Sequence, residues 1–159
     1  MMSNIRRPQV GDLNYLVDID LKCFEDNISL DEWRLFFDDT SYKMLVWIIQ
    51  GIPVGFIIWQ ENTIVRMAVK PVYRHRGIGA QLLFFVENRL VQQRHQTVMT
   101  NIPESLCCPG KPVDVSGWLS KRGYQAESLQ KDAAMFCGCT EDLVHFNKNL
   151  SKRRTTTHG

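Results

Sequence analysis

The sequence has no apolar run long enough to cross a bilayer as a helix, which takes about 20 residues. Its most apolar window runs from Val46 to Trp59, spans 14 residues and is interrupted by the turn-forming residues Gln50-Gly51-Ile52-Pro53. The first residues, MMSNIRRPQVGDL, lack the apolar core of a secretory signal. We therefore expect a soluble cytoplasmic protein with no membrane partner.

A field of positive charge is also absent. The chain has 19 Lys and Arg against 17 Asp and Glu, a net charge of +2. Three of the positive charges, Lys152, Arg153 and Arg154, lie in the last nine residues, so the rest of the chain has a net charge of −1. Nucleic-acid-binding domains have clustered basic side chains. We expect no nucleic-acid partner.

The five cysteines form neither a disulfide framework nor a metal-binding pattern. An odd number of thiols without an export signal indicates reduced cysteines. Paired zinc ligands are usually separated by two to four residues, and an adjacent pair or a C-x-C fits that spacing poorly. We predict structural thiols and no metal site. The cysteines are Cys23, Cys107, Cys108, Cys137 and Cys139.

Length and composition are those of one globular domain. The 159 residues are 44% hydrophobic and 23% charged, which is ordinary for a chain that folds around one core. The sequence contains no internal repeat and no linker. We predict a single domain over residues 1–150 and a disordered tail over residues 151–159.

Hydrophobic periodicity predicts strands alternating with helices. Ser29, with Glu32 three residues later, is typical of a capping box that starts a helix, and Gly123 is typical of a helix C-cap. Leu143, Phe146 and Leu150 have the spacing of a last amphipathic helix, capped by Thr140. The predicted strands cover 4–7, 43–49, 54–59, 63–69, 97–102, 124–129 and 133–139, and the predicted helices cover 13–24, 30–37, 77–90, 115–122 and 140–150.

Residues 67–83 contain a motif that suits an anionic ligand. A strand ends at Pro71, a turn with Arg74 and Arg76 follows, and Gly77 and Gly79 begin a long helix. The first N–H groups of a helix have no intrahelical acceptor, the helix dipole adds partial positive charge, and glycine allows a phosphate to approach the backbone. Two glycines in a first turn cost about 1 kcal/mol each relative to alanine, which indicates a function. The alternative is a glycine-softened helix start with solvated arginines.

Two other phosphate motifs are excluded. The P-loop pattern G-x-x-x-x-G-K-[ST] is absent from the chain. The dinucleotide pattern G-x-G-x-x-G fails because Leu82 stands where its third glycine belongs, and its glycines should follow the first strand of a βαβ unit.

The segment Arg74-His75-Arg76-Gly77-Ile78-Gly79-Ala80 resembles the [Q/R]-x-x-G-x-[G/A] acyl-CoA signature of the Gcn5-related N-acetyltransferase (GNAT) superfamily. The similarity extends over about residues 4–139, including Ile5-Arg6-Arg7-Pro8 and the Gly123-Tyr124 step after a short helix. It implies an α/β (α+β) fold whose mixed, mostly antiparallel central sheet splays apart between its fourth and fifth strands and is flanked by helices. To this we add the predicted C-terminal helix.

The resemblance also implies a cofactor site. Acetyl-CoA would be the cosubstrate, with pantetheine paired to the backbone of Met67 and Val69 like an added strand. Its pyrophosphate would lie on the amides from His75 to Ala80. The implied cofactor-binding residues are Met67, Val69, Arg74, His75, Arg76, Gly77, Ile78, Gly79 and Ala80.

The implied reaction is direct attack of a primary amine on the thioester, without a covalent enzyme intermediate. A protein or peptide amine is our first choice, because Cys23-Phe24-Glu25-Asp26 resembles the start of ribosomal-protein N-terminal acetyltransferases. A polyamine or aminoglycoside acceptor and a catalytically silent CoA-binding module are the alternatives. We expect a monomer or a homodimer.

Three residues are the main candidates for proton transfer. Glu61 would share a strand face with Thr63 and Val65 and accept the amine proton, if the strand extends back that far. Glu104 follows the strand over 97–102 and is the second candidate base. The family's tyrosine acid is replaced by Leu119, which leaves Tyr124 and Ser120 as nearby substitutes, with a core aromatic as the alternative for Tyr124.

Overall fold

The computed structural model describes residues 4–24, 27–103, 115–136 and 139–150. The chain separates into two compact units, residues 1–88 and 89–159, and each unit is described by itself.

The first unit contains an antiparallel sheet in the order β1-β2-β3-β4. The strands are β1 (Ile5–Arg6), β2 (Tyr42–Ile49), β3 (Ile52–Gln60) and β4 (Thr63–Val69). The predicted strands over 43–49 and 54–59 correspond to β2 and β3, which pair as a hairpin with Gln50 and Gly51 both in the left-handed backbone region at φ 52° and 80°. A two-residue hairpin turn of this kind matches the twist of its strands, which explains Gly51 in the turn.

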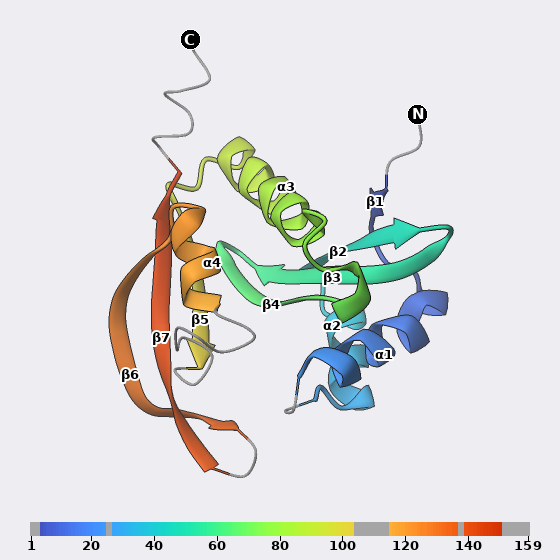
Figure 1. Ribbon diagram of the computed structural model, residues 1–159, viewed down its shortest axis with the longest axis horizontal. Helices are drawn as coiled ribbons and strands as arrows, with labels where there is room; N and C mark the ends of the chain where they lie inside the picture. The colour runs from blue at the N-terminus through green and yellow to red at the C-terminus, as the bar shows by residue number, and fades with distance from the viewer. Residues whose placement is uncertain (1–3, 25–26, 104–114, 137–138, 151–159) are drawn as a thin grey trace. The chain divides into compact units, whose positions relative to one another are not determined.

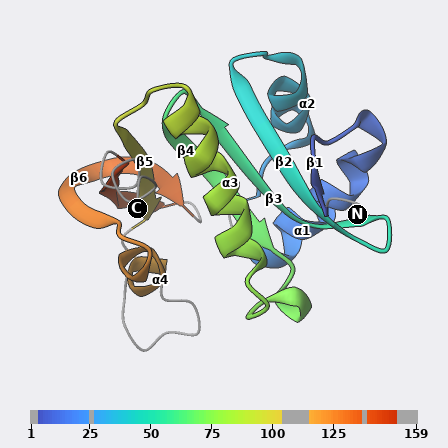
Figure 2. The same ribbon diagram turned by 90° about the horizontal axis from the view of Figure 1, so that it is seen from above.

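Helices cover both faces of this sheet (Figure 1 and Figure 2). On one face lie α1 (Leu13–Cys23), preceded by a 3-10 turn at Val10–Asp12, and α2 (Leu30–Asp38). On the other face lies α3 (Ile78–Gln92), preceded by a 3-10 turn at Pro71–Tyr73. The core between the sheet and the first two helices consists of Leu16, Ile19, Trp33, Met44, Val46, Phe56, Ile58 and Ala68.

The predicted capping box at the start of α2 is confirmed. The Glu32 N–H donates to Ser29 Oγ over 3.1 Å, and the Ser29 N–H donates to Glu32 Oε1 over 3.2 Å. The side chains of Ser29 and Glu32, three positions apart, thereby satisfy two N–H groups that the helix leaves without partners.

The described residues of the second unit form an antiparallel sheet in the order β5-β7-β6 and a short helix. Its elements are β5 (Thr97–Pro103), α4 (Val115–Lys121), β6 (Gln125–Phe136) and β7 (Cys139–Asn149). Helix α4 ends as predicted at Gly123, whose φ is 91°, and the Tyr124 N–H donates back to the Leu119 carbonyl over 3.1 Å. Its buried residues include Val98, Thr100, Leu119, Tyr124, Phe146 and Leu150.

The predicted C-terminal helix over 140–150 is wrong, because this segment is strand β7. The strand lies between β5 and β6, so its main chain is paired on both sides. Val144, His145, Asn147 and Asn149 have low helix propensity, and a short helix is marginal by itself. Leu143 and Phe146 have helical spacing only by coincidence. The predicted strands at 124–129 and 133–139 are extended as predicted in the described residues, but β6 joins most of both in one strand, and Cys139 begins β7.

The predicted mixed α/β fold, with mostly antiparallel strands flanked by helices, is confirmed. The predicted splay concerns β4 of the first unit and β5 of the second, and it stays a prediction. The single domain also stays a prediction. Within the described residues, no helix is both long and apolar enough to span a membrane.

Candidate functional site

The backbone groups of Met67 and Val69 lie on the side of β4 that faces away from β3. The Lys70 N–H donates to the Val54 carbonyl over 2.9 Å, and Val69 lies opposite Gly55. In an antiparallel pair this pattern directs the N–H and C=O of Ala68 toward β3 and those of Met67 and Val69 away from it. The two residues predicted to pair with an extended ligand therefore face the edge that such a ligand would use.

The carbonyl of Val69 is held by two donors from the same unit. Arg74 Nε donates to it over 3.0 Å, and the Cys23 thiol donates to it over 3.3 Å. Burial is the largest influence on Cys23 and raises the pKa of its thiol, so the sulfur is protonated at neutral pH. Arg74 is thus oriented by the strand end before any ligand arrives.

The turn between β4 and α3 has an unusual backbone. His75 and Gly77 adopt φ of 64° and 83° in the left-handed region, which is uncommon for a residue with a side chain such as His75. The first helical hydrogen bond runs from the Gln81 N–H to the Gly77 carbonyl over 3.0 Å. The N–H groups of Ile78, Gly79 and Ala80 accordingly have no acceptor within the helix, as predicted for an anion site.

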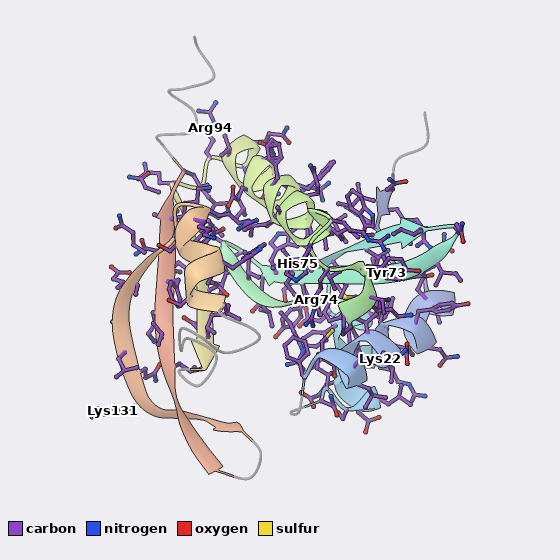
Figure 3. All side chains as sticks on the ribbon, in the orientation of Figure 1. Lys22, Tyr73, Arg74, His75, Arg94 and Lys131 are labelled. Atoms are coloured by element: carbon purple, nitrogen blue, oxygen red, sulfur yellow. The ribbon has the colours of Figure 1, made fainter. Side chains whose placement is uncertain are left out.

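Side chains around this turn are basic, with His75 and Arg76 exposed and Arg74 half-buried. The guanidinium of Arg76 lies 5.2 Å from the centroid of the Tyr73 ring, a cation–π contact that holds it beside the turn. Figure 3 shows Tyr73, Arg74 and His75 together on the segment that joins β4 to α3. A Cβ on Gly77 would meet no heavy atom within 4 Å, so Gly77 is required for its φ and not for lack of space. The turn is open to an anionic ligand.

Gly55 brings β3 close to the start of α3, a contact that the sequence analysis did not identify. A Cβ at this position would lie 3.1 Å from the Ala68 carbonyl oxygen and 3.3 Å from Val69 Cγ2. It would also lie 3.5 Å from Ile78 Cγ2. The available signal was a glycine inside an apolar strand, which marks a close approach of backbone or ligand.

Glu61 does not lie on β4. It occupies the two-residue turn between β3 and β4, is exposed, and has a left-handed φ of 53°. The pairing of β3 with β4 shifts between Ile58 and Trp59, which inserts an extra β4 residue at Val65 as a bulge. The premise that Glu61, Thr63 and Val65 share one strand face is therefore wrong, and a basic role for Glu61 stays a prediction.

The other two candidates for proton transfer belong to the second unit. Tyr124 is buried, with 2% of its surface exposed, and Lys148 Nζ lies 5.7 Å from its ring centroid. This agrees with the core-aromatic alternative and leaves an acid role a prediction. Glu104 lies outside the described residues, as do Cys107, Cys108 and Cys137.

Polar clusters that the sequence analysis missed occur in both units. In the first, Asp20 on α1 pairs with Arg66 on β4. In the second, the ring nitrogens of His145 contact the side-chain oxygens of Asn101 and Gln130 on the two neighbouring strands. The sequence feature that could have indicated the Asp20–Arg66 pair is a charged residue inside each of two apolar segments. The residues that the structure describes contain no group of three His, Cys, Asp or Glu placed to hold a metal ion.

Comparisons with known proteins agree with this geometry. Residues 10–105, more than half of the chain, match the acetyltransferase (GNAT) domain family. An uncharacterized N-acetyltransferase from Schizosaccharomyces pombe is 25% identical over 150 residues, which cover 88% of this chain and 94% of that protein.

Solved structures show the same fold. The ribosomal-protein-S18-alanine N-acetyltransferase of Escherichia coli superimposes with a TM-score of 0.76 at 16% identity, over 94% of each chain. The spermidine/spermine N-acetyltransferase of Vibrio cholerae gives a TM-score of 0.71 at 13% identity, over 96% of this chain and 95% of that one. The family match, the relative and the shared fold lead to one conclusion: the chain belongs to the GNAT family and is an N-acetyltransferase.

Proposed function

We propose that this protein transfers an acetyl group from acetyl-CoA to a primary amine of a protein or peptide. The supporting observation is the continuous path from the outer edge of β4 to the first turn of α3. Backbone groups of Met67 and Val69 face outward along this path, and the N–H groups of Ile78, Gly79 and Ala80 stand at its end. An extended amide-containing arm that ends in a diphosphate has the matching chemistry.

The charge and the backbone conformation of this path support acetyl-CoA as the ligand. Diphosphate oxygens would accept hydrogen bonds from the amides of residues 75–80, with His75, Arg74 and Arg76 around them. The left-handed φ of Gly77 turns the chain into α3 so that successive amides point outward. The amide groups of pantetheine would pair with Met67 and with the N–H of Val69, since the Val69 carbonyl already accepts from Arg74 and Cys23.

The proposed chemistry forms an N–C bond between the acceptor nitrogen and the acetyl carbon and breaks the C–S bond of the thioester. An ammonium has no lone pair, so it first gives one proton to a base and becomes the free amine that attacks. The nitrogen loses a second proton as the amide forms, and this loss balances the proton taken up by the departing thiolate, whose parent thiol has a pKa near 8.5. Glu61 and Glu104 are the proposed acceptors of the first proton, and Tyr124 is the proposed donor to the thiolate, reprotonated by the second.

Water is the proposed intermediary for Glu61. This carboxylate is exposed at a turn, where water surrounds it. A chain of water molecules would carry the proton from the amine to Glu61 without direct contact between the two groups.

A small cationic amine is the second candidate acceptor. Residues 12–39 contain nine acidic and two basic residues, a net charge of −7 in α1, α2 and their connection. Such a segment attracts cationic acceptors, which include polyamines, aminoglycosides and lysine-rich peptides. The Vibrio cholerae neighbour, a spermidine/spermine N-acetyltransferase, has the same fold and is consistent with this candidate.

An acceptor panel tests the proposal. Purified protein is incubated with acetyl-CoA and with peptides that have free N-termini, lysine peptides, spermidine or an aminoglycoside, and acetylated products are measured by mass spectrometry. Product detection is preferable to a thiol reagent because the chain itself has five cysteines. We expect acetylation of a peptide N-terminus. Acetylation of spermidine alone would favour the second candidate, and acetyl-CoA binding without any product would favour a silent CoA-binding module.

A further inference from the structure

A buried ion pair fastens the end of α1 to β4. Arg66 Nη2 lies 2.6 Å from Asp20 Oδ1, and Arg66 Nε donates to the same oxygen over 2.8 Å. Asp20 is 1% exposed, and the Arg66 side chain is 19% exposed. Removing two charges from water is costly unless their hydrogen bonds are well satisfied, so such a pair inside an apolar helix–sheet contact requires an explanation.

The same carboxylate also holds the chain that leaves α1. Asp20 Oδ2 accepts the Ile28 N–H over 2.8 Å, and the Asp20 carbonyl accepts from Asn27 Nδ2 over 3.2 Å. Asn27 Nδ2 also donates to the Phe24 carbonyl over 2.7 Å. One buried residue therefore organises both described ends of the α1–α2 connection.

Arg66 contributes a second contact to this connection. Its guanidinium carbon lies 3.8 Å above the centroid of the Phe24 ring, a close cation–π stack. Arg66 is next to Met67 on β4, and the Cys23 thiol contacts the Val69 carbonyl two residues farther along. The end of α1 and the Phe24 ring are thus attached to the segment of β4 that faces the proposed cofactor path.

The direction of the proposed cofactor path indicates which end of acetyl-CoA would lie near Phe24. An arm that starts at the diphosphate turn and runs back along β4 passes Val69 and then Met67, advancing about 3.3 Å per residue. On the proposed path its thioester end would come level with Arg66 and the bulge at Val65. The acceptor amine must reach this end, since the reacting atoms have to meet there.

We infer that Asp20 and Arg66 form a positioning pair that holds Phe24 and Ile28 as a wall of the acceptor site, and that the pair sets acceptor affinity without setting cofactor affinity. The inference rests on the proposed function for the meaning of the acceptor site. The hydrogen bonds and the ring stack that define the pair are independent of that function.

Asp20→Asn is the principal test, and Asp18→Asn is the matched control. Arg66 donates to Oδ1 and the Ile28 N–H donates to Oδ2, and asparagine replaces one of these two acceptors with an NH2 donor. Asp18 is on the same helix and pairs with Lys22 and Lys70, but its side chain is 43% exposed, so its loss should have little effect. A double variant, Asp20→Leu with Arg66→Met, replaces both charges by apolar groups and guards against misfolding of the single variant.

The first measurement is amide hydrogen exchange without any ligand. In Asp20→Asn and in the double variant we expect exchange at Ile28 to accelerate at least tenfold, with Ile19 in the core still protected. Asp18→Asn should exchange like the wild type. Equal exchange at Ile28 in a folded Asp20→Asn protein would overturn the positioning role.

The second measurement separates the effect on acceptor affinity from the effect on cofactor affinity. Using spermidine and an alanine-starting peptide as acceptors, we expect the acceptor KM of Asp20→Asn to rise about tenfold, with Arg66→Lys intermediate because the charge is kept. The Kd of acetyl-CoA from calorimetry should stay within twofold of the wild type. An unchanged acceptor KM, or a tenfold loss of acetyl-CoA affinity, would overturn the acceptor role.

Failure of the proposed function is distinguishable from failure of the inference. If the wild type acetylates neither probe, the proposed function fails for these acceptors, and the exchange comparison still decides whether the pair positions Phe24 and Ile28. If the wild type is active, the inference fails when Asp20→Asn and Asp18→Asn behave alike.

Discussion

Arg74 Nε and the carbonyl oxygen of Val69, five residues apart in the chain, are joined by a hydrogen bond of 3.0 Å. This bond folds the basic turn back onto the last residue of β4. The turn is consequently organised before a ligand binds, and less ordering free energy is lost on binding. The amides of this turn and the backbone groups of Met67 and Val69 that face away from β3 are the groups that the proposed acetyl-CoA site would use.

Gly79→Glu should abolish acetyl-CoA binding. The substitution places a carboxylate in the first turn of α3, where the diphosphate would accept hydrogen bonds from the amides. We expect calorimetry to show at least a hundredfold loss of affinity, about 2.7 kcal/mol, in a protein that remains folded. Gln92→Glu, at the exposed opposite end of the same helix, adds the same charge and should bind normally. Unchanged affinity in Gly79→Glu would remove the cofactor site from this turn.

Two substitutions at Glu61 separate chemistry from backbone strain. Glu61→Gln and Glu61→Gly both remove the carboxylate, and each should lower turnover roughly 10²-fold while acetyl-CoA binding is kept. Glycine also suits the left-handed φ of 53°, so Glu61→Gly should raise the free energy of unfolding by about 1 kcal/mol. Steady-state kinetics from pH 6 to 9 and denaturant unfolding measure both effects. Full activity in both variants would show that Glu61 is not the base and would direct the same test to Glu104.

The stabilising contribution of Asp12 should depend on pH. Hydrogen bonds from Arg6, at 2.7 and 3.0 Å, lower the pKa of the Asp12 carboxyl, and the Gln9 N–H adds a further bond. A lowered pKa means that this stabilisation is complete above the unfolded value near 3.9 and is lost as the pH falls through the folded value.

Asp12→Asn tests this dependence. At pH 7 it should lower the free energy of unfolding by about 1 kcal/mol, since Arg6 is partly exposed. The difference from the wild type should shrink below pH 4. Asp31→Asn, whose carboxylate is 94% exposed, should match the wild type throughout. A difference that stays constant down to pH 2 would contradict the assignment.

Purified protein should contain no stoichiometric zinc. The cysteine spacings fit zinc poorly, and Cys23 is engaged with the Val69 carbonyl. Elemental analysis of untagged protein, prepared without chelator, should give well under one metal ion per chain. A ratio near one would direct attention to Cys107, Cys108, Cys137 and Cys139.

Helix caps and turns were predictable from the sequence because the interactions that form them lie within a few residues. The side chains of Ser29 and Glu32 satisfy the first amides of α2, and Gly123 supplies the left-handed residue that ends α4. The turn before α3 is of the same kind, since Gly77 and Gly79 act on the amides that immediately follow them. Strand and helix patterns through residue 121, and the cofactor motif, depend on such short-range effects.

Tertiary pairing decided the rest. Strand β7 has helical spacing of Leu143 and Phe146, and only its position between β5 and β6 makes the extended form stable. The surroundings of Glu61 depend on a bulge that appears when β3 pairs with β4. Arg66 and Asp20 are 46 residues apart, and their charges are compensated only after α1 packs on the sheet. Hydrogen bonds between distant segments have free energies comparable to local propensities, so a sequence pattern cannot rank them until the packing is known.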